Sequence, residues 1–367
     1  MFSCSKAAIA IALIVSVLHG SQTIQRHKQY VTGELFNKKA RGAYHHLFSV
    51  EIDALLLERS QGSIKDLVVA SGGPVNPTTI TTACQERPPG EVMLTSRELV
   101  NKQHFRPGVA AAIYLYPSQD TTFEIRGITG LSWKGIKNIR CTQNLSLPTI
   151  GDSTDDYNHA NIVRGEYLSW LKGAEVNYIR HITPRYINAF SCSGRVVGSF
   201  FEVEEALQLA FQKEGFIVDD STTVWDHSSY RINTKALFVG GSVGFDLEYN
   251  PTHVITCGIR AKGGLGANIG KNRTRMNDLN STETLLDYKT SGVNLAYIFT
   301  GYPFLEFRPA KSFSLLLDYQ ILYLGSITVA EKQAVFNAKV LVRRWEIINS
   351  RGYFFCHGLR AALKLNF

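Results

Sequence analysis

Ten segments of this chain alternate apolar with polar residues, and the connections between them are alternately long and short. Successive side chains of a β-strand point to opposite faces of a sheet, so alternation predicts strands with one apolar and one polar face. The segments are His45–Arg59, Arg106–Tyr116, Thr122–Trp133, Tyr167–Ile182, Ile187–Glu202, Arg231–Tyr249, His253–Ile269, Val293–Phe307, Ser312–Leu324 and Gly352–Phe367. We expect long loops at 60–104, 135–163, 203–227, 271–287 and 326–351, and short turns at 117–120, 183–185, 250–252 and 308–311. Within 203–227, residues 204–215 also have helical spacing.

The last segment shows the alternation most clearly. Every odd position from Leu359 to Phe367 is apolar, whereas the even positions include Arg360 and Lys364. A membrane barrel needs a lipid face, a wet lumen face and aromatic residues at its interfaces, and this segment offers all three. The edge strand of a soluble sandwich alternates equally well, so the segment alone leaves both folds open. In a barrel, Phe367 would be the C-terminal assembly signal.

The alternation of long and short connections decides between a membrane barrel and a soluble sandwich. Bacterial outer-membrane barrels have even strand numbers, short periplasmic turns and long external loops. Nothing in the architecture of a soluble sandwich requires long and short connections to alternate strictly. The sequence therefore predicts an all-β, transmembrane, antiparallel up-and-down β-barrel of about 10 strands. Twelve strands is the alternative, because 60–104 and 326–351 each have room for a further strand or half-hairpin.

The N-terminal residues read as an export signal. Lys6 is followed by a largely apolar run, 7–18, and then by the small residues Gly20 and Ser21. This run is shorter than the roughly 20 residues that a spanning helix needs. We expect a secretion signal peptide at 1–20, a periplasmic N-terminal segment at 21–44 and the barrel at 45–367. The expected location is the outer membrane.

Composition and charge limit the classes of molecule that we expect the protein to bind. The chain has 30 Gly, 16 Tyr and 20 Phe with only 19% charged residues, which suits a β-rich chain with aromatic anchors. The net charge is +8, but the basic residues are scattered along the sequence. We therefore expect no nucleic-acid partner, and name outer-membrane lipid and lipopolysaccharide as partners instead. The C-terminal strand would be read by the barrel-assembly machinery, and the loops are candidate sites for host or surface ligands.

Six cysteines are present, and none of them has the spacing of a metal or thioredoxin-like site. Five follow the predicted signal, so at least one thiol is left free or pairs between molecules. Cys84 and Cys141 fall in predicted loops and form the favoured intramolecular pair. The pairing of Cys192, Cys257 and Cys356 stays open.

The polar faces of the strands predict a charged lumen. Seven acids and six bases would point inward: Glu51, Asp53, Glu124, Glu175, Asp246, Glu248 and Asp318, with Arg126, Arg195, Arg260, Lys262, Arg360 and Lys364. A ten-stranded barrel is narrow, since wide aqueous pores appear near 16 strands. Unpaired buried ions cost several kcal/mol each, so we expect these charges to pair and close the lumen. A small diffusion pore lined by the same residues is the alternative.

Catalysis finds little support in the sequence. Nucleophilic catalysis requires Ser, His and a carboxylate or amide to converge, but the histidines are scattered and no nucleophile-elbow motif is present. We therefore expect no enzyme, and no catalytic, cofactor-binding or metal-binding residues and no cofactors. A membrane-embedded hydrolase is the third and weakest reading.

Four short motifs resemble those of a known family. They are 174–180 (AEVNYIR), 198–205 (GSFFEVEE), 230–235 (YRINTK) and 318–324 (DYQILYL). In this order they are similar to a family of predicted outer-membrane barrels from planctomycetes, chlamydia-related bacteria and Legionella-like major outer-membrane proteins. The chain departs from that pattern at Ser199-Phe200, where Arg is common, and at 235–237, where Asn is common. The resemblance implies barrel walls and marks no catalytic site.

Taken together, the sequence predicts an outer-membrane barrel with a structural or surface-display role and a narrow, charge-paired lumen. A small general-diffusion porin is the alternative.

Overall fold

The computed structural model describes residues 47–60, 64–71, 88–101, 103–118, 120–148, 157, 159–183, 189–214, 225–252, 254–277, 284–334 and 348–367. The predicted signal peptide (1–20) and periplasmic segment (21–44) lie outside these residues. Within the described part, no helix is long and apolar enough to cross a membrane.

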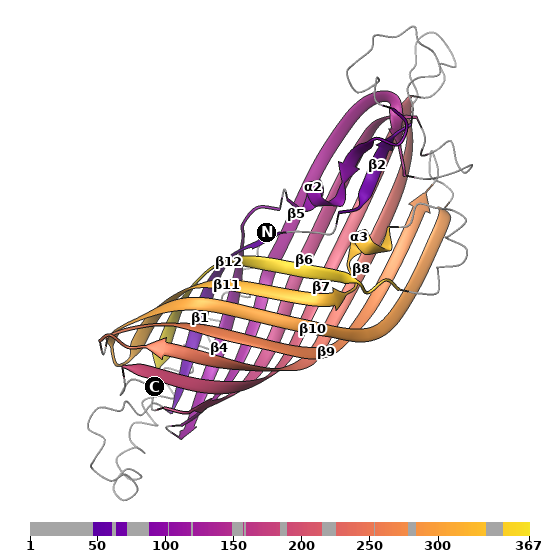
Figure 1. The fold of residues 1–367 in the computed structure, drawn as a ribbon. Coiled ribbons are helices and arrows are strands. Elements are labelled where there is room, and N and C mark those ends of the chain that lie inside the picture. The colour runs from indigo at the N-terminus through magenta and orange to yellow at the C-terminus, as the bar shows by residue number, and fades with distance from the viewer. Residues whose placement is uncertain are drawn as a thin grey trace, which may run out of the picture.

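Ten strands form a closed antiparallel ring (Figure 1). They are β1 (Phe48–Arg59), β4 (Arg106–Ser118), β5 (Thr121–Ser146), β6 (Ala160–His181), β7 (Phe190–Glu214), β8 (Trp225–Tyr249), β9 (Ile255–Asn277), β10 (Thr284–Ala310), β11 (Phe313–Ile327) and β12 (Gly352–Asn366). Each strand pairs with the next in the chain, and β12 returns to pair with β1, Ile52 opposite Leu363. The predicted up-and-down barrel is confirmed.

Two further strands belong to the same sheet but stand outside the ring. β2 (Asp66–Ala70) and β3 (Val92–Thr95) pair antiparallel with each other, and β2 also pairs with the end of β5. The short helix α2 (Ser96–Val100) follows β3 and begins in a capping box between Thr95 and Glu98. A second short helix, α3 (Ala330–Gln333), lies between β11 and β12. We call β2, β3, α2 and α3 the inner segments, because they pack on inward-facing side chains of β6, β7 and β8 such as Val163, Leu207 and Ile232.

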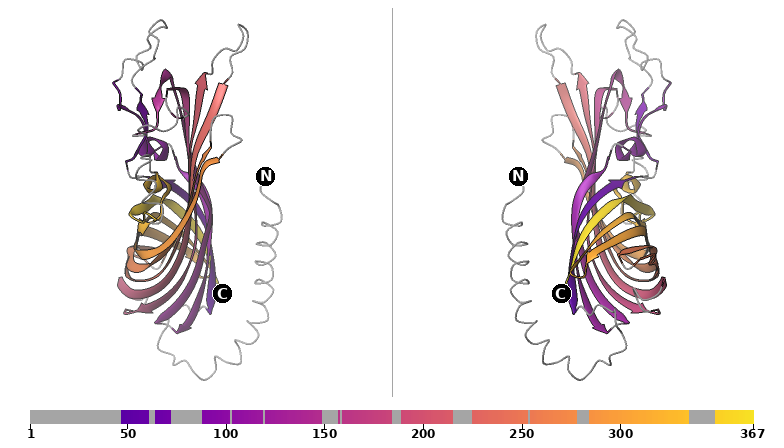
Figure 2. Two further views of the ribbon diagram at one scale, coloured as in Figure 1. Left: turned by 90° about the vertical axis from the view of Figure 1, so that its right-hand side faces the viewer. Right: turned by 90° about the vertical axis from the view of Figure 1, so that its left-hand side faces the viewer.

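The wall of the barrel is uneven in height (Figures 1 and 2). β5 to β10 have 22 to 27 residues, whereas β1, β4, β11 and β12 have 12 to 15. A spanning strand needs only about 9–11 residues, so the longer strands rise well beyond a bilayer. This corrects the loops predicted at 135–163, 203–227 and 271–287. Residues 135–146, 203–214 and 271–277 continue the strands, and the helical reading of 204–215 is wrong.

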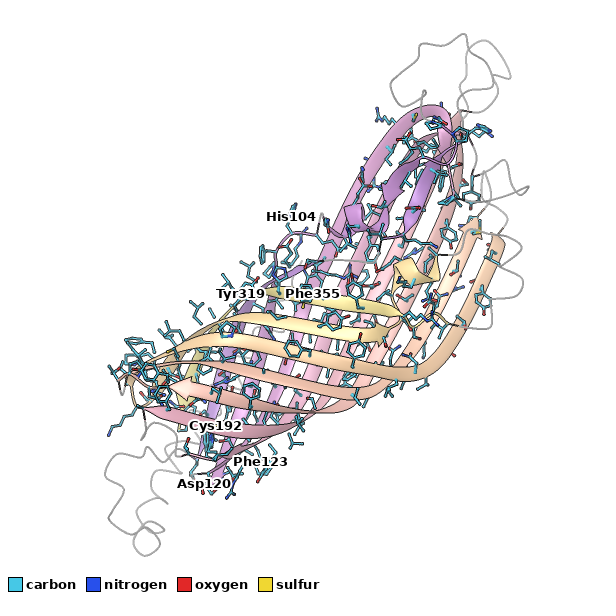
Figure 3. The ribbon with its side chains drawn as sticks, viewed as in Figure 1. His104, Asp120, Phe123, Cys192, Tyr319 and Phe355 are labelled. Atoms are coloured by element: carbon cyan, nitrogen blue, oxygen red, sulfur yellow. The ribbon has the colours of Figure 1, made fainter. Side chains whose placement is uncertain are left out.

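An apolar belt surrounds the barrel on the side of the short turns. Large apolar side chains are exposed there on every strand of the ring, for example Ile113, Val196, Val243 and Leu295. Aromatic residues lie at its edges: the Phe48 and Phe367 rings stack 4.8 Å apart, and Phe123 lies near the turn at Asp120 (Figure 3). We take as membrane-spanning the parts of the strands that carry this belt, namely 48–58, 109–115, 123–132, 170–178, 190–200, 237–249, 255–269, 293–307, 313–323 and 353–367.

We call the strand parts beyond the belt the raised wall: 134–146, 160–168, 202–214, 225–235, 271–277 and 284–291. In β5 the ladder with β6 shifts between Ile128 and Leu131, and Gly130 supplies the left-handed backbone (φ +82°) that this bulge needs. The barrel thus carries a tall side, and the inner segments cover the inner face of that side.

Candidate functional site: the barrel interior

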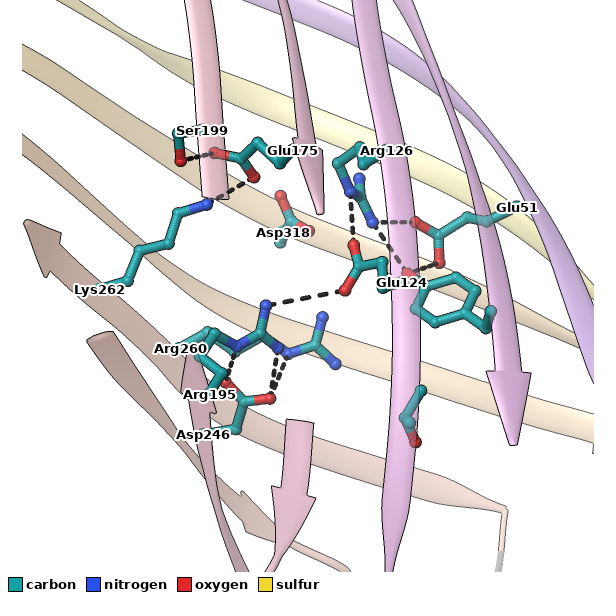
Figure 4. A network of polar contacts seen from close by, with 12 residues as sticks. Glu51, Glu124, Arg126, Glu175, Arg195, Ser199, Asp246, Arg260, Lys262 and Asp318 are labelled. Atoms are coloured by element: carbon teal, nitrogen blue, oxygen red, sulfur yellow. Dashed lines mark hydrogen bonds and ion pairs between the residues drawn. The ribbon is translucent and has the colours of Figure 1, made fainter. Parts of the chain in front are cut away.

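The thirteen predicted lumen residues all face inward and are buried. They lie in the belt region, and we call them the charge layer: Glu51, Asp53, Glu124, Arg126, Glu175, Arg195, Asp246, Glu248, Arg260, Lys262, Asp318, Arg360 and Lys364. Their exposed fractions lie between 1% and 9%, so none is freely hydrated. Figure 4 shows part of this layer, in which Arg126 points toward Glu51 and Glu124, and Arg195 points toward Asp246.

Arg126 on β5 is the centre of one half of the charge layer. Its guanidinium reaches Glu51 Oε1 at 2.5 Å, Asp53 Oδ2 at 2.6 Å and Glu124 Oε1 at 2.8 Å. Glu51 and Asp53 belong to β1, with β4 between them and Arg126. β4 presents Ala112 at this point, and its small side chain leaves room for the guanidinium to cross. Charge-assisted bonds of this kind are the strong ones among protein hydrogen bonds.

Arg360 on β12 spans the seam that closes the barrel. It donates to Asp318 Oδ2 on β11 from Nε at 2.7 Å and also from Nη2. Its Nη1 lies 3.3 Å from Glu51 Oε1 and 3.2 Å from Asp53 Oδ2 on β1. Lys364 is opposite Glu51 in the strand register, but its ammonium stands 3.9 Å from the centre of the Tyr114 ring. One guanidinium therefore ties three consecutive strands together.

The opposite wall holds a second group of pairs. Arg195 binds Asp246 through two bonds of 3.1 and 2.6 Å and reaches Glu124 at 3.7 Å. Lys262 Nζ lies 2.5 Å from Glu175 Oε2, and Ser199 donates to the same carboxylate at 3.5 Å.

Arg260 joins this second group at longer range. Its Nε lies 3.6 Å from Asp246 Oδ2, and its Nη2 lies 3.9 Å from Glu248 Oε1. The Phe304 ring centre is 4.4 Å from the guanidinium carbon. A cavity of about 20 Å³ remains within the charge layer, between residues such as Glu124, Arg195 and Asp246. A volume of this order holds one or two water molecules, not a solute.

An apolar layer, which we did not predict from the sequence, lies directly above these charges. Nineteen buried residues on the inner face form one cluster, which we call the apolar layer: Leu55, Leu57, Ala110, Ile128, Leu131, Trp133, Leu171, Phe201, Val203, Ala236, Phe238, Ala296, Ile298, Leu322, Leu324, Ile327, Val329, Phe354 and Cys356. The indole of Trp133 donates to the Leu57 carbonyl at 3.0 Å and packs edge-on to Phe354 at 5.8 Å between ring centres. The signal was present as neighbouring apolar residues on both faces of a strand, as in Phe200-Phe201 and Phe354-Phe355.

A third, polar cluster lies above the apolar layer and fastens α3 to the wall. Glu205 on β7 accepts from Arg59 Nη2 at 2.5 Å, from the Tyr167 hydroxyl at 2.6 Å and from the Ala330 backbone N–H at 2.9 Å. The same Tyr167 hydroxyl contacts Glu331 of α3. Glu205 lies beyond the membrane-spanning part of β7. Burial raises its pKa, and the charge of Glu331 raises it further, against the opposing effect of Arg59.

The cysteines are spread over these regions. Cys141 on β5 is disulfide-bonded, and its partner lies outside the described residues, as does Cys84. The Cys84–Cys141 pair therefore stays a prediction. Cys192, Cys257 and Cys356 are free thiols. In the described part of the chain, no group of three or more His, Cys, Asp or Glu is arranged to hold a metal ion.

Comparisons with known proteins return barrels of the outer membrane. The outer-membrane protease OmpT of Escherichia coli matches at 8% identity and a TM-score of 0.45, over 87% of this chain and 96% of that chain. The toluene transporter TodX of P. putida matches at 7% identity and a TM-score of 0.22, over 87% and 90%. The outer-membrane channel DcaP of Acinetobacter baumannii matches at 10% identity and a TM-score of 0.18, over 87% and 96%. Neither protein-family models nor curated proteins give a match.

These likenesses are too distant to assign an activity, and the fold rests on the strand pairing described above. One expectation is corrected by them. From the sequence we predict that the protein is not an enzyme, but the first of these barrels is a protease. The prediction that the protein is not an enzyme is therefore withdrawn. The resemblance to the planctomycete, chlamydia-related and Legionella-like family gains no support from these matches.

Proposed function

We propose that the protein is an outer-membrane barrel with a closed lumen, which holds the raised wall and the inner segments out on the cell surface. The apolar layer carries this proposal. A polar solute would have to pass a level of the barrel that is filled by side chains such as Trp133, Phe201 and Phe354, each at most 1% exposed. Narrow apolar constrictions exclude water and ions, so such a layer favours a closed barrel over a porin.

The charge layer supports the same reading. In a conducting pore, charged side chains line a wet channel and stay partly exposed. Here Arg126 contacts three carboxylates and Arg360 also contacts three, two of which, Glu51 and Asp53, are common to both, and all of these groups are buried. Such a set of bonds ties β1, β5, β11 and β12 across the lumen. We infer that these charges stabilise the barrel and do not conduct.

The raised wall supports a display role. It begins where the apolar belt ends, and its outer face carries charged side chains such as Lys134, Arg164 and Arg273. Long loops and extended strands face outward in bacterial barrels, whereas short turns face the periplasm. This orientation would place the raised wall and the inner segments outside the cell.

Export and assembly complete the proposal. Export would require the secretion signal at 1–20. Assembly would require that the barrel-assembly machinery recognises the C-terminal strand, which ends in Phe367. Membership of the planctomycete, chlamydia-related and Legionella-like family of barrels is a further part of it, supported by the four motifs and their order. Host or surface ligands would be bound by the loops of the raised side.

Planar-bilayer recording of the refolded full chain tests the closed lumen. Correct refolding is first checked by heat-modifiable mobility on a gel, in which a folded barrel migrates differently before and after boiling. We expect a folded sample to insert without stepwise conductance. A stable, stepwise conductance from the folded protein would refute the closed lumen and restore the small porin.

A further inference from the structure

Six basic side chains gather on the outer face of the raised wall, although they are scattered in the sequence. Arg231 and Lys235 lie on β8, Lys271, Arg273 and Arg275 on β9, and Lys289 on β10, and we call them the basic patch. All six occupy outward-facing positions of neighbouring strands. Arg231, Lys271, Arg275 and Lys289 are exposed, whereas Lys235 and Arg273 are half-buried.

The basic patch begins where the apolar belt stops. Leu237 and Ile269 are the last outward apolar residues of β8 and β9, and the next outward positions are Lys235 and Lys271. On β10, Val293 is 70% exposed, and Lys289 lies two outward positions further on. The strand parts concerned rise together beyond β11 and β12 in Figure 1. The patch is therefore at the height where a lipid layer changes from acyl chains to headgroups.

Strand register sets these cations directly against one another. Lys235 is opposite Lys271, Arg231 is opposite Arg275, and Arg273 is opposite Lys289. Like charges directly across a strand pair destabilise a sheet. Three such pairs side by side are unfavourable unless an anion lies between them.

The carboxylates of the chain satisfy only part of the basic patch. Asp287 contacts Arg273 at 2.6 Å and Arg275 at 3.3 Å. Glu202 and Glu204 contact Lys235 at 2.8 and 2.9 Å. In the described part of the chain, Arg231, Lys271 and Lys289 have no carboxylate within 4.0 Å.

We propose that the basic patch binds the phosphates of a phosphorylated lipid headgroup in the outer leaflet, of the lipid A type. Arg and Lys bind phosphate through charge-assisted hydrogen bonds, and the adjoining Leu237, Ile269 and Val293 would contact the acyl chains of the same molecule. Continuity with the apolar belt favours a lipid over a nucleic acid or an acidic protein. The inference rests on the orientation given under the proposed function, but it needs no statement about conductance.

Binding of lipid A to the refolded full chain in zwitterionic detergent tests this. The variant carries K271E and K289E, two exposed cations with no carboxylate partner among the described residues, so that no internal ion pair is lost. Its control carries R180E and K311E, two exposed cations near the short turns at the opposite end of the barrel. Both changes alter the net charge equally, and heat-modifiable mobility checks the folding of each.

We expect bisphosphorylated lipid A to bind the wild type and the control within about twofold of each other, and the variant about tenfold or more weakly. Dephosphorylated lipid A should bind wild type as weakly as the variant binds the phosphorylated form. Equal loss in variant and control, or equal affinity for dephosphorylated lipid, would overturn the proposal. Polyphosphate without acyl chains that binds as tightly as lipid A would also overturn it, because the patch would then be a general anion surface. If the refolded barrel conducted but still bound phosphorylated lipid A selectively, the closed lumen would be refuted and the lipid site would stand.

Discussion

At the scale of single residues, the interior depends on cations that are each shared by several carboxylates. Arg126 has three carboxylates within 2.8 Å, and its guanidinium joins β5 to β1. Removing one member of a buried ion group costs more than the group contributes, because its partners are left charged and unsolvated. The barrel is therefore sensitive to the loss of such a cation, whatever the net contribution of the whole charge layer.

Replacing Arg126 by Met tests this dependence. The substitution keeps much of the side-chain volume but leaves Glu51, Asp53 and Glu124 with less compensation. We expect the free energy of unfolding to fall by about 3–5 kcal/mol, measured by urea titration of the refolded barrel. Lys134→Met is the control, since its ion pair with Glu166 lies on the outer surface and should contribute at most about 1 kcal/mol. An equal loss of unfolding free energy in both variants would show that the contribution of an ion pair to stability does not depend on its burial.

The Glu205 carboxyl predicts a pH dependence in the attachment of α3. Its pKa is raised above the ordinary value of 4.5, so the folded state holds the proton more tightly than the unfolded state. The stabilisation is complete below pH 4.5 and is lost as the pH rises through the folded-state pKa. We expect the amides of α3 to exchange progressively faster, relative to their intrinsic rates, as the pH rises through this pKa, because the ionised carboxylate then lies close to Glu331 of α3.

A matched control is available on α2. Burial raises the pKa of Glu98, but hydrogen bonds from Lys137 and Thr95 outweigh it, and the net pKa is lowered. Its contribution is therefore lost only as the pH falls below the ordinary range, and the amides of α2 should keep constant protection from about pH 5 to 8. Glu205→Gln should flatten the profile of α3. An unchanged profile in that variant would assign the pH response to another group.

At the scale of elements, closure of the ring depends on the end of the last strand. Phe367 N–H donates to the Phe48 carbonyl at 3.0 Å, and its own carbonyl accepts from Leu47 N–H at 2.9 Å. Its ring stacks on Phe48 at the edge of the apolar belt. We expect deletion of Phe367 to lower the yield of folded, inserted barrel, measured by heat-modifiable mobility and surface labelling. Phe367→Tyr keeps an interfacial ring and should restore the yield. A deletion variant that reached wild-type levels would contradict this role.

The ring itself could be predicted because the apolar belt imposes one parity on every strand. In β7, for example, Val196 and Phe200 face lipid, whereas the buried Val197 and Ser199 face the lumen. The upper strand ends were missed because this parity reverses beyond the belt. From Phe201 onward the apolar residues of β7 face inward, at Val203, Leu207 and Leu209. The apolar residues of β7 thus change from one face to the other within the strand, so its sequence does not read as a single alternating segment. Ala206 and Ala210 add further apolar positions above the belt, and together these positions have a misleading helical spacing.

The inner segments were missed for a different physical reason. β2, β3, α2 and α3 are four or five residues long and have little periodicity of their own. Their positions are fixed by contacts with distant strands, such as the hydrogen bond that the Ala330 backbone N–H donates to Glu205. The thirteen charge-layer residues could be named from parity, but their partners could not. Parity gives the face of a side chain, whereas the reach of Arg126 past Ala112 depends on the side chains of the intervening strand.

At the scale of the whole molecule, the interior is stacked in three levels of different chemistry. The charge layer lies in the belt region, the apolar layer lies above it, and the inner segments pack on the raised wall with the Glu205 cluster between. The outside has the complementary order, with the belt against lipid and the basic patch above it. Each level has a separate consequence: the charge layer ties strands across the lumen, the apolar layer closes the lumen, and the raised wall presents a surface.

Opening the apolar layer is the sharpest test of this division. Alanine at Phe201, Phe238 and Phe354 removes three inward rings from β7, β8 and β12. Each Phe→Ala change in a core costs about 3–5 kcal/mol, so folding is checked first by heat-modifiable mobility, and the three single variants serve if the triple variant does not fold. We expect stepwise conductance in bilayers from the folded variant, because water can enter a layer that loses its apolar filling.

The control removes side chains next to these in the sequence but on the lipid face: Phe200, Val239 and Phe355, each replaced by alanine. It changes the same three strands at neighbouring positions and leaves the apolar layer filled, so it should stay silent in the same recordings. If the inward variant folded and also stayed silent, the barrier would lie in the charge layer or the inner segments. Conductance in the inward variant alone would place the seal of this barrel in the apolar layer, one level above the charges that the sequence made visible.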